Sequence, residues 1–247
     1  MLFDEKKNEG GAAMTLARLL DIRPGVTAVI GSGGKTTLLR MLGEELAEAG
    51  GRVLLCTTTK ILPFPGLPCA CDRAELDDLA ASRLLCAGMP LENGKLTVPE
   101  IPVAELAARF DYVLVEADGS ARLPLKAHAS HEPVIPPEAN QTICLVGVSG
   151  FGKPIREAAH RPERFAALAG VEVKENATPE NTARVLLAEA LADRYLFNQA
   201  DTPERWEWAR RCGECLPWPW AGASLKNGVY FDGCAHKGGG GETICWL

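Results

Sequence analysis

The stretch VIGSGGKTTLL, residues 29–39, constrains the fold of this chain more than any other feature. Gly31, Gly33, Gly34 and Lys35 lie here between an apolar run and the first turn of an expected helix. Glycines in such a loop let successive backbone N–H groups converge on phosphate oxygens, and the helix N-terminus adds unpaired N–H groups. The lysine adds a positive charge for the terminal phosphates. The stretch therefore predicts a phosphate-binding loop.

This loop is shorter than the full pattern G-x-x-x-x-G-K-[ST], because the position five before Gly34 is Val29. Its form, G-S-G-G-K-T-T, resembles the loop of the ATP-dependent ligases of bacterial cell-wall synthesis. We expect the Thr36 hydroxyl to bind Mg²⁺. The alternative is a glycine-rich turn with a solvated lysine. The expected nucleotide-binding residues of the loop are Gly31, Ser32, Gly33, Gly34, Lys35, Thr36 and Thr37.

The residues around the loop predict alternating strands and helices. An apolar strand at 26–30 is followed by apolar residues at helical spacing up to Gly50 and Gly51, and then by a strand at 53–57, which is the order of a right-handed βαβ unit. Further strands are expected at 83–87, 111–117, 141–148 and 195–197, and further helices at 14–21, 103–109 and 179–193. The fold class is α/β and P-loop NTPase-like, with a mainly parallel, doubly wound sheet flanked by helices and an inserted hairpin region.

The whole chain, residues 1–247, is expected to form a single nucleotide-binding domain. Residues 1–13 are expected to be a mobile tail, and the proline-rich residues 63–102 an irregular insertion. Within that insertion, Asn93 and Gly94 between apolar flanks predict a hairpin turn. Residues 222–247 are glycine-rich and are expected to form a tail.

Composition limits the partners of the chain. Acidic residues outnumber basic residues by 32 to 26 and no basic cluster is present, which argues against nucleic-acid binding and favours a small-molecule or protein partner. No apolar run reaches the length of a membrane span, and the N-terminus is charged where a signal peptide would be apolar, so we expect a cytoplasmic protein. Cys212 and Cys215 have the spacing of a zinc pair, which Cys234, His236 or Cys245 would have to complete.

Two acids follow the expected strand at 111–117. Side chains alternate along a strand, so Glu116 and Asp118 are expected to point to the same side, toward Mg²⁺ and the phosphates. One of them would bind the metal while the other acts as the base. The alternative is that Asp118 and Gly119 only begin a turn. Residues 57–60, Thr-Thr-Thr-Lys, lie at the same edge of the sheet, where they contact phosphate or substrate or form a plain helix cap.

A base-reading motif is predicted near the end of the chain. Residues 198–201, Asn-Gln-Ala-Asp, resemble the N-K-x-D motif of GTP-binding proteins, whose aspartate accepts two hydrogen bonds from guanine. Asn198 and Asp201 are the expected contacts, and Gln199 departs from the lysine of the motif. Residues 223–225 are expected to close the base pocket. The alternative is a strand that ends in a polar turn.

The span EADGSARLPLKAHASHEPVIP at 116–136, with LVGVSGFGKPI at 145–155, extends beyond a generic nucleotide site. Together with GSGGKTT, CTTTK and FNQAD, it resembles the bacterial family of the selenium cofactor biosynthesis protein YqeC, also described as selenium-dependent hydroxylase accessory proteins. The resemblance implies a soluble P-loop protein that acts in the maturation of selenium-dependent molybdenum hydroxylases.

The prolines of residues 116–136 are expected to hold a second substrate site rigid. Lys126 is the candidate for a second phosphate or transition-state contact, and His131 for acid–base work, although a surface lysine and a hydrogen-bonded histidine are the commoner outcomes. The expected function is ATP or GTP hydrolysis with Mg²⁺, or phosphoryl transfer or ligation to a small acceptor. The alternative is a non-catalytic or GTPase-switch accessory protein that delivers a cofactor to an apo-hydroxylase.

Overall fold

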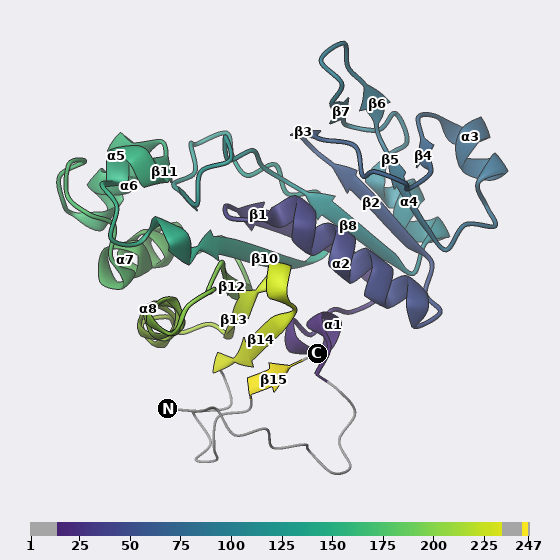
Figure 1. Cartoon of the computed structure of the whole chain (residues 1–247). Coiled ribbons are helices and arrows are strands. Elements are labelled where there is room, and N and C mark those ends of the chain that lie inside the picture. Colours follow the sequence, from purple (N-terminus) through teal and green to yellow (C-terminus); the bar gives the residue numbers. More distant parts are fainter. Residues whose placement is uncertain (1–13, 234–243, 247) are drawn as a thin grey trace.

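The computed structural model describes residues 14–233 and 244–246, and its centre is one large sheet (Figure 1). Neighbouring strands run parallel from β4 through β13, and β14 is antiparallel to both of its neighbours. The predicted α/β fold with a mainly parallel sheet is confirmed. In spatial order the strands are β15 (Ile244–Trp246), β14 (Val229–Asp232), β13 (Trp220–Ser224), β12 (Arg194–Asn198), β10 (Ala139–Gly147), β1 (Gly25–Gly31), β8 (Tyr112–Glu116), β2 (Val53–Thr57), β5 (Leu84–Ala87) and β4 (Cys69–Ala70).

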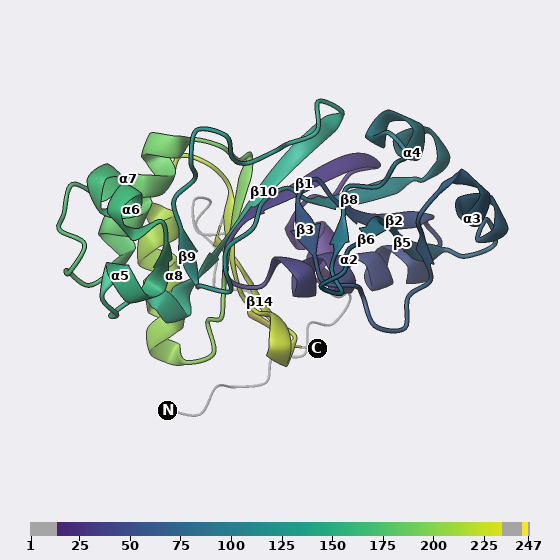
Figure 2. The same cartoon turned by 90° about the horizontal axis from the view of Figure 1, so that it is seen from above.

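Helices cover both faces of this sheet, as a doubly wound fold requires. Val29 of β1 packs in the cluster that holds the leucines of α2, whereas Ala28 and Ile30 pack in the cluster of α5 to α8 on the opposite face. Figure 2 shows α3 and α4 at one end of the molecule and α5 to α8 at the other. The helices are α1 (Leu16–Leu19), α2 (Lys35–Glu48), α3 (Arg73–Asp78), α4 (Val103–Arg109), α5 (Ile155–Ala158), α6 (Pro162–Ala169), α7 (Pro179–Glu189) and α8 (Pro203–Glu214). None of the helices described is long and apolar enough to cross a bilayer.

Two small sheets flank the large one. β3 (Lys60–Ile61), β7 (Leu96–Thr97) and β6 (Met89–Pro90) pair antiparallel, and the predicted turn at Asn93 and Gly94 connects β6 to β7 (Figure 1). β9 (Leu125–Lys126) pairs with β11 (Ala159–His160). Two short 3₁₀ helices, η1 (Val148–Gly150) and η2 (Leu225–Asn227), follow β10 and β13.

Two segments are more ordered than the sequence indicates. Residues 63–102 are not irregular throughout, because β4, which was not expected, pairs with β5 at the expected strand 83–87, and both extend the large sheet. Residues 222–247 are not only a tail, because they complete β13 and form β14. Gly222 serves packing, because a Cβ on it would lie 2.8 Å from the ring of Trp206. Residues 1–13, expected to be a mobile tail, lie outside the described residues, as do 234–243.

The strand order places a crevice at β1. From β1 the chain passes through α2 to β2 on one side, and from β8 it crosses to β10 on the other side of β1. In open α/β sheets, ligands bind at the carboxyl ends of the strands where the winding reverses. The end of β1, next to the ends of β8 and β10, is therefore the expected binding edge.

Candidate functional site

The glycine loop lies at this binding edge and has a backbone shape that side chains would prevent. Gly31, Gly33 and Gly34 have positive φ angles of 87°, 97° and 120°. A Cβ on Gly33 would lie 2.5 Å from the Cα of Gly147 in β10. Helix α2 begins directly after Gly34 and no side chain caps it, so its first N–H groups are available to an anion. The loop is therefore shaped as an anion cradle.

Lys35 is buried at the start of α2 and folds back over the loop. Its Nζ donates to the carbonyl oxygen of Gly31 at 2.7 Å and lies 2.9 Å from Oδ1 of Asp118. Oε1 of Glu116 is 4.0 Å from the same nitrogen. The tertiary structure thus brings the lysine and both acids of the sequence prediction together.

Glu116 faces Thr36 across the mouth of the loop. The Thr36 hydroxyl donates to Oε2 of Glu116 at 2.9 Å. Burial raises the pKa of Glu116 and outweighs the opposing effects of the nearby Lys35 charge and the Thr36 hydrogen bond. A carboxylate with a raised pKa accepts a proton more readily, and its pairing with a hydroxyl places two hard oxygen donors side by side.

Asp118 is fully buried and binds four donors. Its Oδ2 accepts from the backbone N–H of Gly31 at 2.9 Å and lies 2.9 Å from Lys126 Nζ and 2.8 Å from His128 Nε2. Burial raises the pKa of Asp118, but the His128 hydrogen bond and the charges of Lys35 and Lys126 outweigh it and hold the pKa well below its usual range. Asp118 does not line the cleft, unlike the expectation that it faces Mg²⁺, because it follows the end of β8 and turns inward.

Lys126 and His128 lie on and after β9 and point into the same buried network. Lys126 Nζ is 2.8 Å from Glu132, which also pairs with Arg161. His128 Nδ1 lies 2.7 Å from Glu189 at the end of α7. Burial lowers the pKa of His128, but the hydrogen bonds to Asp118 and Glu189 outweigh it and raise the pKa. These contacts connect the glycine loop to helix α7.

His131, the histidine preferred from the sequence, is exposed and does not line the cleft. The buried histidine is His128, which was not predicted from the sequence. The signal that could have found it is alternation: Lys126 and His128 are two residues apart, and Leu125 and Ala127 complete an apolar environment. Lys126 is buried and paired, so it is not a free surface cation.

An open cleft of about 370 Å³ extends from the loop. Glu116 lines this cleft. The wall of the cleft continues over the connection after β8 and over the small antiparallel sheet of β3, β7 and β6. The lining residues are Gly33, Gly34, Lys35, Thr36, Thr37, Lys60, Ile61, Leu62, Lys95, Glu116, Gly119, Ser120, Ala121, Arg122, Leu123 and Gln199.

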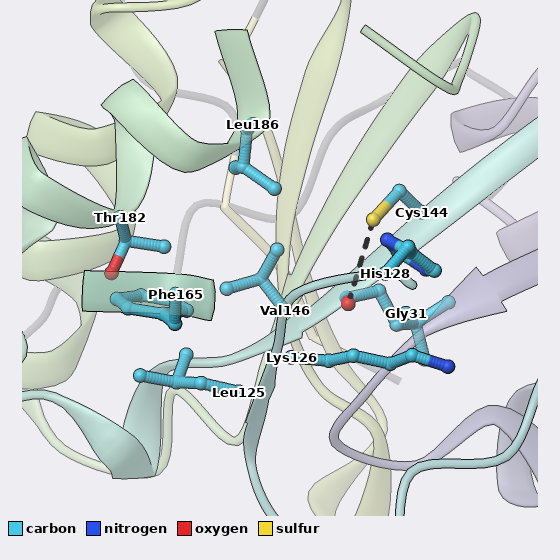
Figure 3. A pocket seen from close by; sticks show the side chains of 10 residues that line it. Gly31, Leu125, Lys126, His128, Cys144, Val146, Phe165, Thr182 and Leu186 are labelled. Atoms are coloured by element: carbon cyan, nitrogen blue, oxygen red, sulfur yellow. Dashed lines mark hydrogen bonds between the residues drawn. The ribbon is translucent and has the colours of Figure 1, made fainter. Parts of the chain in front are cut away.

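A second, much smaller cavity lies behind the loop (Figure 3). Figure 3 shows Lys126, His128 and Gly31 on one side of it and Phe165, Thr182 and Leu186 on the other. Its volume of about 10 Å³ is close to that needed by a single water molecule. It is therefore too small for a substrate.

The predicted base-reading motif, residues 198–201, contacts the glycine loop through Asn198. Asn198 Nδ2 donates to the carbonyl oxygen of Gly33 at 2.7 Å, and its Oδ1 accepts from the backbone N–H of Leu225 at 3.1 Å. Asp201 accepts from the Ser224 hydroxyl at 2.5 Å and lies 2.9 Å from Lys226. Burial raises the pKa of Asp201, but these two partners outweigh it and lower the pKa. The aspartate is thus ionised and held by the segment expected to close the base pocket.

Two of the threonines of residues 57–60, Thr57 and Thr58, are committed to the backbone. Thr57 Oγ1 donates to the carbonyl oxygen of Glu116 at 2.8 Å, and Thr58 Oγ1 to that of Val134 at 2.7 Å. They do not cap a helix, because β3 follows them directly. Lys60 is the member of this group that lines the cleft.

The zinc alternative finds no support within 14–233 and 244–246. Cys212 is buried in α8 and Cys215 is exposed at its end. Among the residues that the structure describes, no three His, Cys, Asp or Glu side chains are grouped so that they could hold a metal ion. Cys234 and His236 lie outside the described residues.

Residues 27–163 match the sequence model of the family described as "YqeC protein". A relative from Escherichia coli strain K12, "Uncharacterized protein YqeC", is 35% identical over 174 residues, and the match spans 66% of this chain and 65% of the relative. Among solved structures, FtsY from Mycoplasma mycoides is similar, with a TM-score of 0.40 and 12% identity over 82% of this chain and 61% of that one. This structural similarity is too low to carry an argument about function.

Proposed function

The chain belongs to the YqeC protein family, and on that premise we propose that it binds a nucleoside triphosphate with Mg²⁺ and hydrolyses it or transfers its terminal phosphoryl group to a small acceptor. One observation carries this proposal. The glycine loop at the carboxyl end of β1 forms an uncapped helix N-terminus beside Lys35, with the Thr36 and Glu116 oxygens 2.9 Å apart at its mouth.

The oxygen donors at the mouth of the loop fit Mg²⁺. This ion takes one or two protein oxygens and completes its shell with water and phosphate oxygens, so the Thr36 hydroxyl would bind it directly and Glu116 would contact it through a bound water, which leaves the carboxylate free to accept a proton. When bound, Mg²⁺ would neutralise charge that develops on the phosphates. Asp118, with its oxygens committed to Gly31, Lys35, Lys126 and His128, is a positioning residue rather than a metal ligand.

On this proposal, the backbone N–H groups of the loop and the Lys35 side chain bind the phosphates. In the free protein, Lys35 Nζ bonds to Gly31 and Asp118, so it is held within reach of the cradle. Phosphate oxygens in the cradle offer Nζ a stronger, charge-assisted partner than the Gly31 carbonyl. Lys126 and His128 remain to neutralise Asp118 when Lys35 turns toward the phosphates.

Glu116 is the proposed base. An oxygen of water or of the acceptor forms a bond to the terminal phosphorus, and the bond from that phosphorus to the bridging oxygen breaks, which releases the nucleoside diphosphate. The proton of the attacking oxygen passes to Glu116, whose raised pKa suits this role. His131 has no part in this scheme because it does not line the cleft.

Asn198 and Asp201 are the proposed base contacts. Asn198 bonds to the loop at Gly33, and Asp201, three residues further along the chain, is an ionised acceptor; of residues 198–201, Gln199 is the one that lines the cleft itself. An acceptor of this kind favours guanine, which offers two donors to a carboxylate, over adenine. Gln199 in place of the lysine of the motif removes the stem that packs on the base.

The family resemblance supports a role in maturing selenium-dependent molybdenum hydroxylases. On this proposal the partner is a small acceptor molecule or an apo-hydroxylase. A second candidate, a GTPase-like switch that times delivery of a cofactor, is favoured by one observation: Asp118 and His128 connect the glycine loop to Glu189 of α7. A change at the phosphates would reach that helix through buried contacts.

The test is calorimetric binding of ATP and GTP in the presence of Mg²⁺, followed by phosphate release. Lys35→Ala should weaken binding at least a hundredfold, and Lys153→Ala, an exposed lysine outside the cleft, should not. If Lys35→Ala binds both nucleotides as the parent does, the proposal fails in both forms. GTP preference that Asp201→Ala abolishes would favour the switch, whereas phosphorylated product formed only with an added acceptor would favour the transferase.

A further inference from the structure

The cleft has a cationic end that the phosphate loop does not account for. Lys60 of β3, Lys95 before β7 and Arg122 of the connection after β8 line it together, although they come from three separate segments. Glu116 is the carboxylate among the lining residues. The chain as a whole has a net charge of −6, so this local excess of positive charge runs against the overall balance.

These three cations are available to a ligand. None of them pairs with a carboxylate within residues 14–233 and 244–246, whereas the exposed Arg73 and the half-buried Arg109 both do so. Unpaired cations that share one cleft raise the local potential and attract anions. Their charge therefore has no structural partner in the part of the chain described.

The position of this end follows from the strand order. Gln199 follows β12 on one side of β1, and Lys60 follows β2 on the other side, with the glycine loop between them. A nucleotide whose base lies against Asn198 and Asp201 would direct its terminal phosphate toward β2. The cationic end thus lies beyond the terminal phosphate, where an acceptor must enter for phosphoryl transfer.

Apolar side chains share the cationic end. Ile61 and Leu62 follow Lys60 in the chain, Leu123 follows Arg122, and all three line the cleft; Leu62 is 47% exposed in the free protein. A ligand that covers Leu62 would remove apolar surface from water. The site therefore combines an anion-binding edge with an apolar wall.

We propose that this end of the cleft binds the acceptor, and that the acceptor is a small molecule with a phosphate or carboxylate group and an apolar body. The inference rests on the proposed function and deepens it. Lys60, Lys95 and Arg122 bind the anionic group, Leu62 covers the body, and the reactive group of the acceptor faces Glu116.

The test is calorimetry in which inorganic pyrophosphate is titrated into protein saturated with Mg²⁺ and a non-hydrolysable ATP or GTP analogue, so that the loop is already filled. One pyrophosphate should bind per chain. Lys60→Ala and Arg122→Ala should each weaken it about tenfold, because each removes a charge-assisted contact. Lys60→Arg should restore binding, and Lys153→Ala should leave it unchanged. Both replaced side chains are exposed, so the fold should persist.

The possible failures are distinct. If the analogue binds but pyrophosphate does not, or binds equally to the parent and to both alanine variants, the acceptor site is refuted and the proposed function stands. If the analogue itself does not bind to the parent, the proposed function is refuted, and the acceptor site with it.

Discussion

Replacing Asp118 by asparagine tests whether this buried carboxylate holds the site together. Asparagine has nearly the same shape, so no cavity forms, but a negative charge is removed from Lys35, Lys126 and His128. Asp118 lies 2.9 Å from each lysine and 2.8 Å from the histidine and is fully buried. Breaking a buried pair by removing one partner costs about 3–5 kcal/mol, against a total stability of about 5–15 kcal/mol for a domain.

The assay is urea unfolding followed by tryptophan fluorescence. With a slope of about 2 kcal/mol per molar, the midpoint should fall by about 2 M at pH 7. The matched control is Glu132→Gln, which also releases Lys126 but from a partly exposed carboxylate, so its loss should be about 1 kcal/mol or less. Equal losses in the two variants, or a loss below about 1 kcal/mol for Asp118→Asn, would refute the reasoning.

The pH dependence gives a second check on Asp118. Its pKa is held below the usual value, so its stabilising contribution is fully present above the unfolded pKa of about 3.9 and is lost as the pH falls through the folded pKa. The difference between parent and Asp118→Asn should therefore persist at pH 5 and shrink only in stronger acid. A difference that vanished by pH 5 would contradict this assignment.

Three further predictions concern the loop, the buried histidine and the metal. Gly33→Ala should weaken nucleotide binding at least tenfold and cost about 1–3 kcal/mol of stability, because its Cβ would lie 2.5 Å from Gly147. The control is Gly66→Ala, which also has a positive φ but has open space around it. Equal nucleotide affinity in the two variants would count against the cradle. His128 has a raised pKa, so its contribution to stability is full below about pH 6.5 and is lost as the pH rises through the folded pKa. The loss of unfolding free energy in His128→Gln should therefore be larger at pH 6 than at pH 9. The reverse order would disprove the assignment. Thr36→Val should raise the Mg²⁺ concentration needed for half-maximal nucleotide binding about tenfold, and an unchanged requirement in a Mg²⁺ titration would exclude Thr36 as a ligand.

Most of the sheet was predictable because its strands are short apolar runs separated by helical patterns. The predicted strand at 53–57 and helix at 103–109 coincide with β2 and α4. β4 and β14 were not predicted. β4 has only two residues, and the apolar run of β14, residues 229–231, stands in a glycine-bearing segment that hides it, although Gly222 is needed there because Trp206 packs against it.

The sequence by itself determined the loop and the two acids, because glycines, a lysine and carboxylates at the ends of strands are local signals of an anion site. Only the tertiary structure decided what each side chain does. Asp118 turns away from the cleft, His128 rather than His131 is buried, and Lys60 and Arg122 line the same cleft. These outcomes depend on how distant segments pack around β1, and no spacing along the chain encodes such distances.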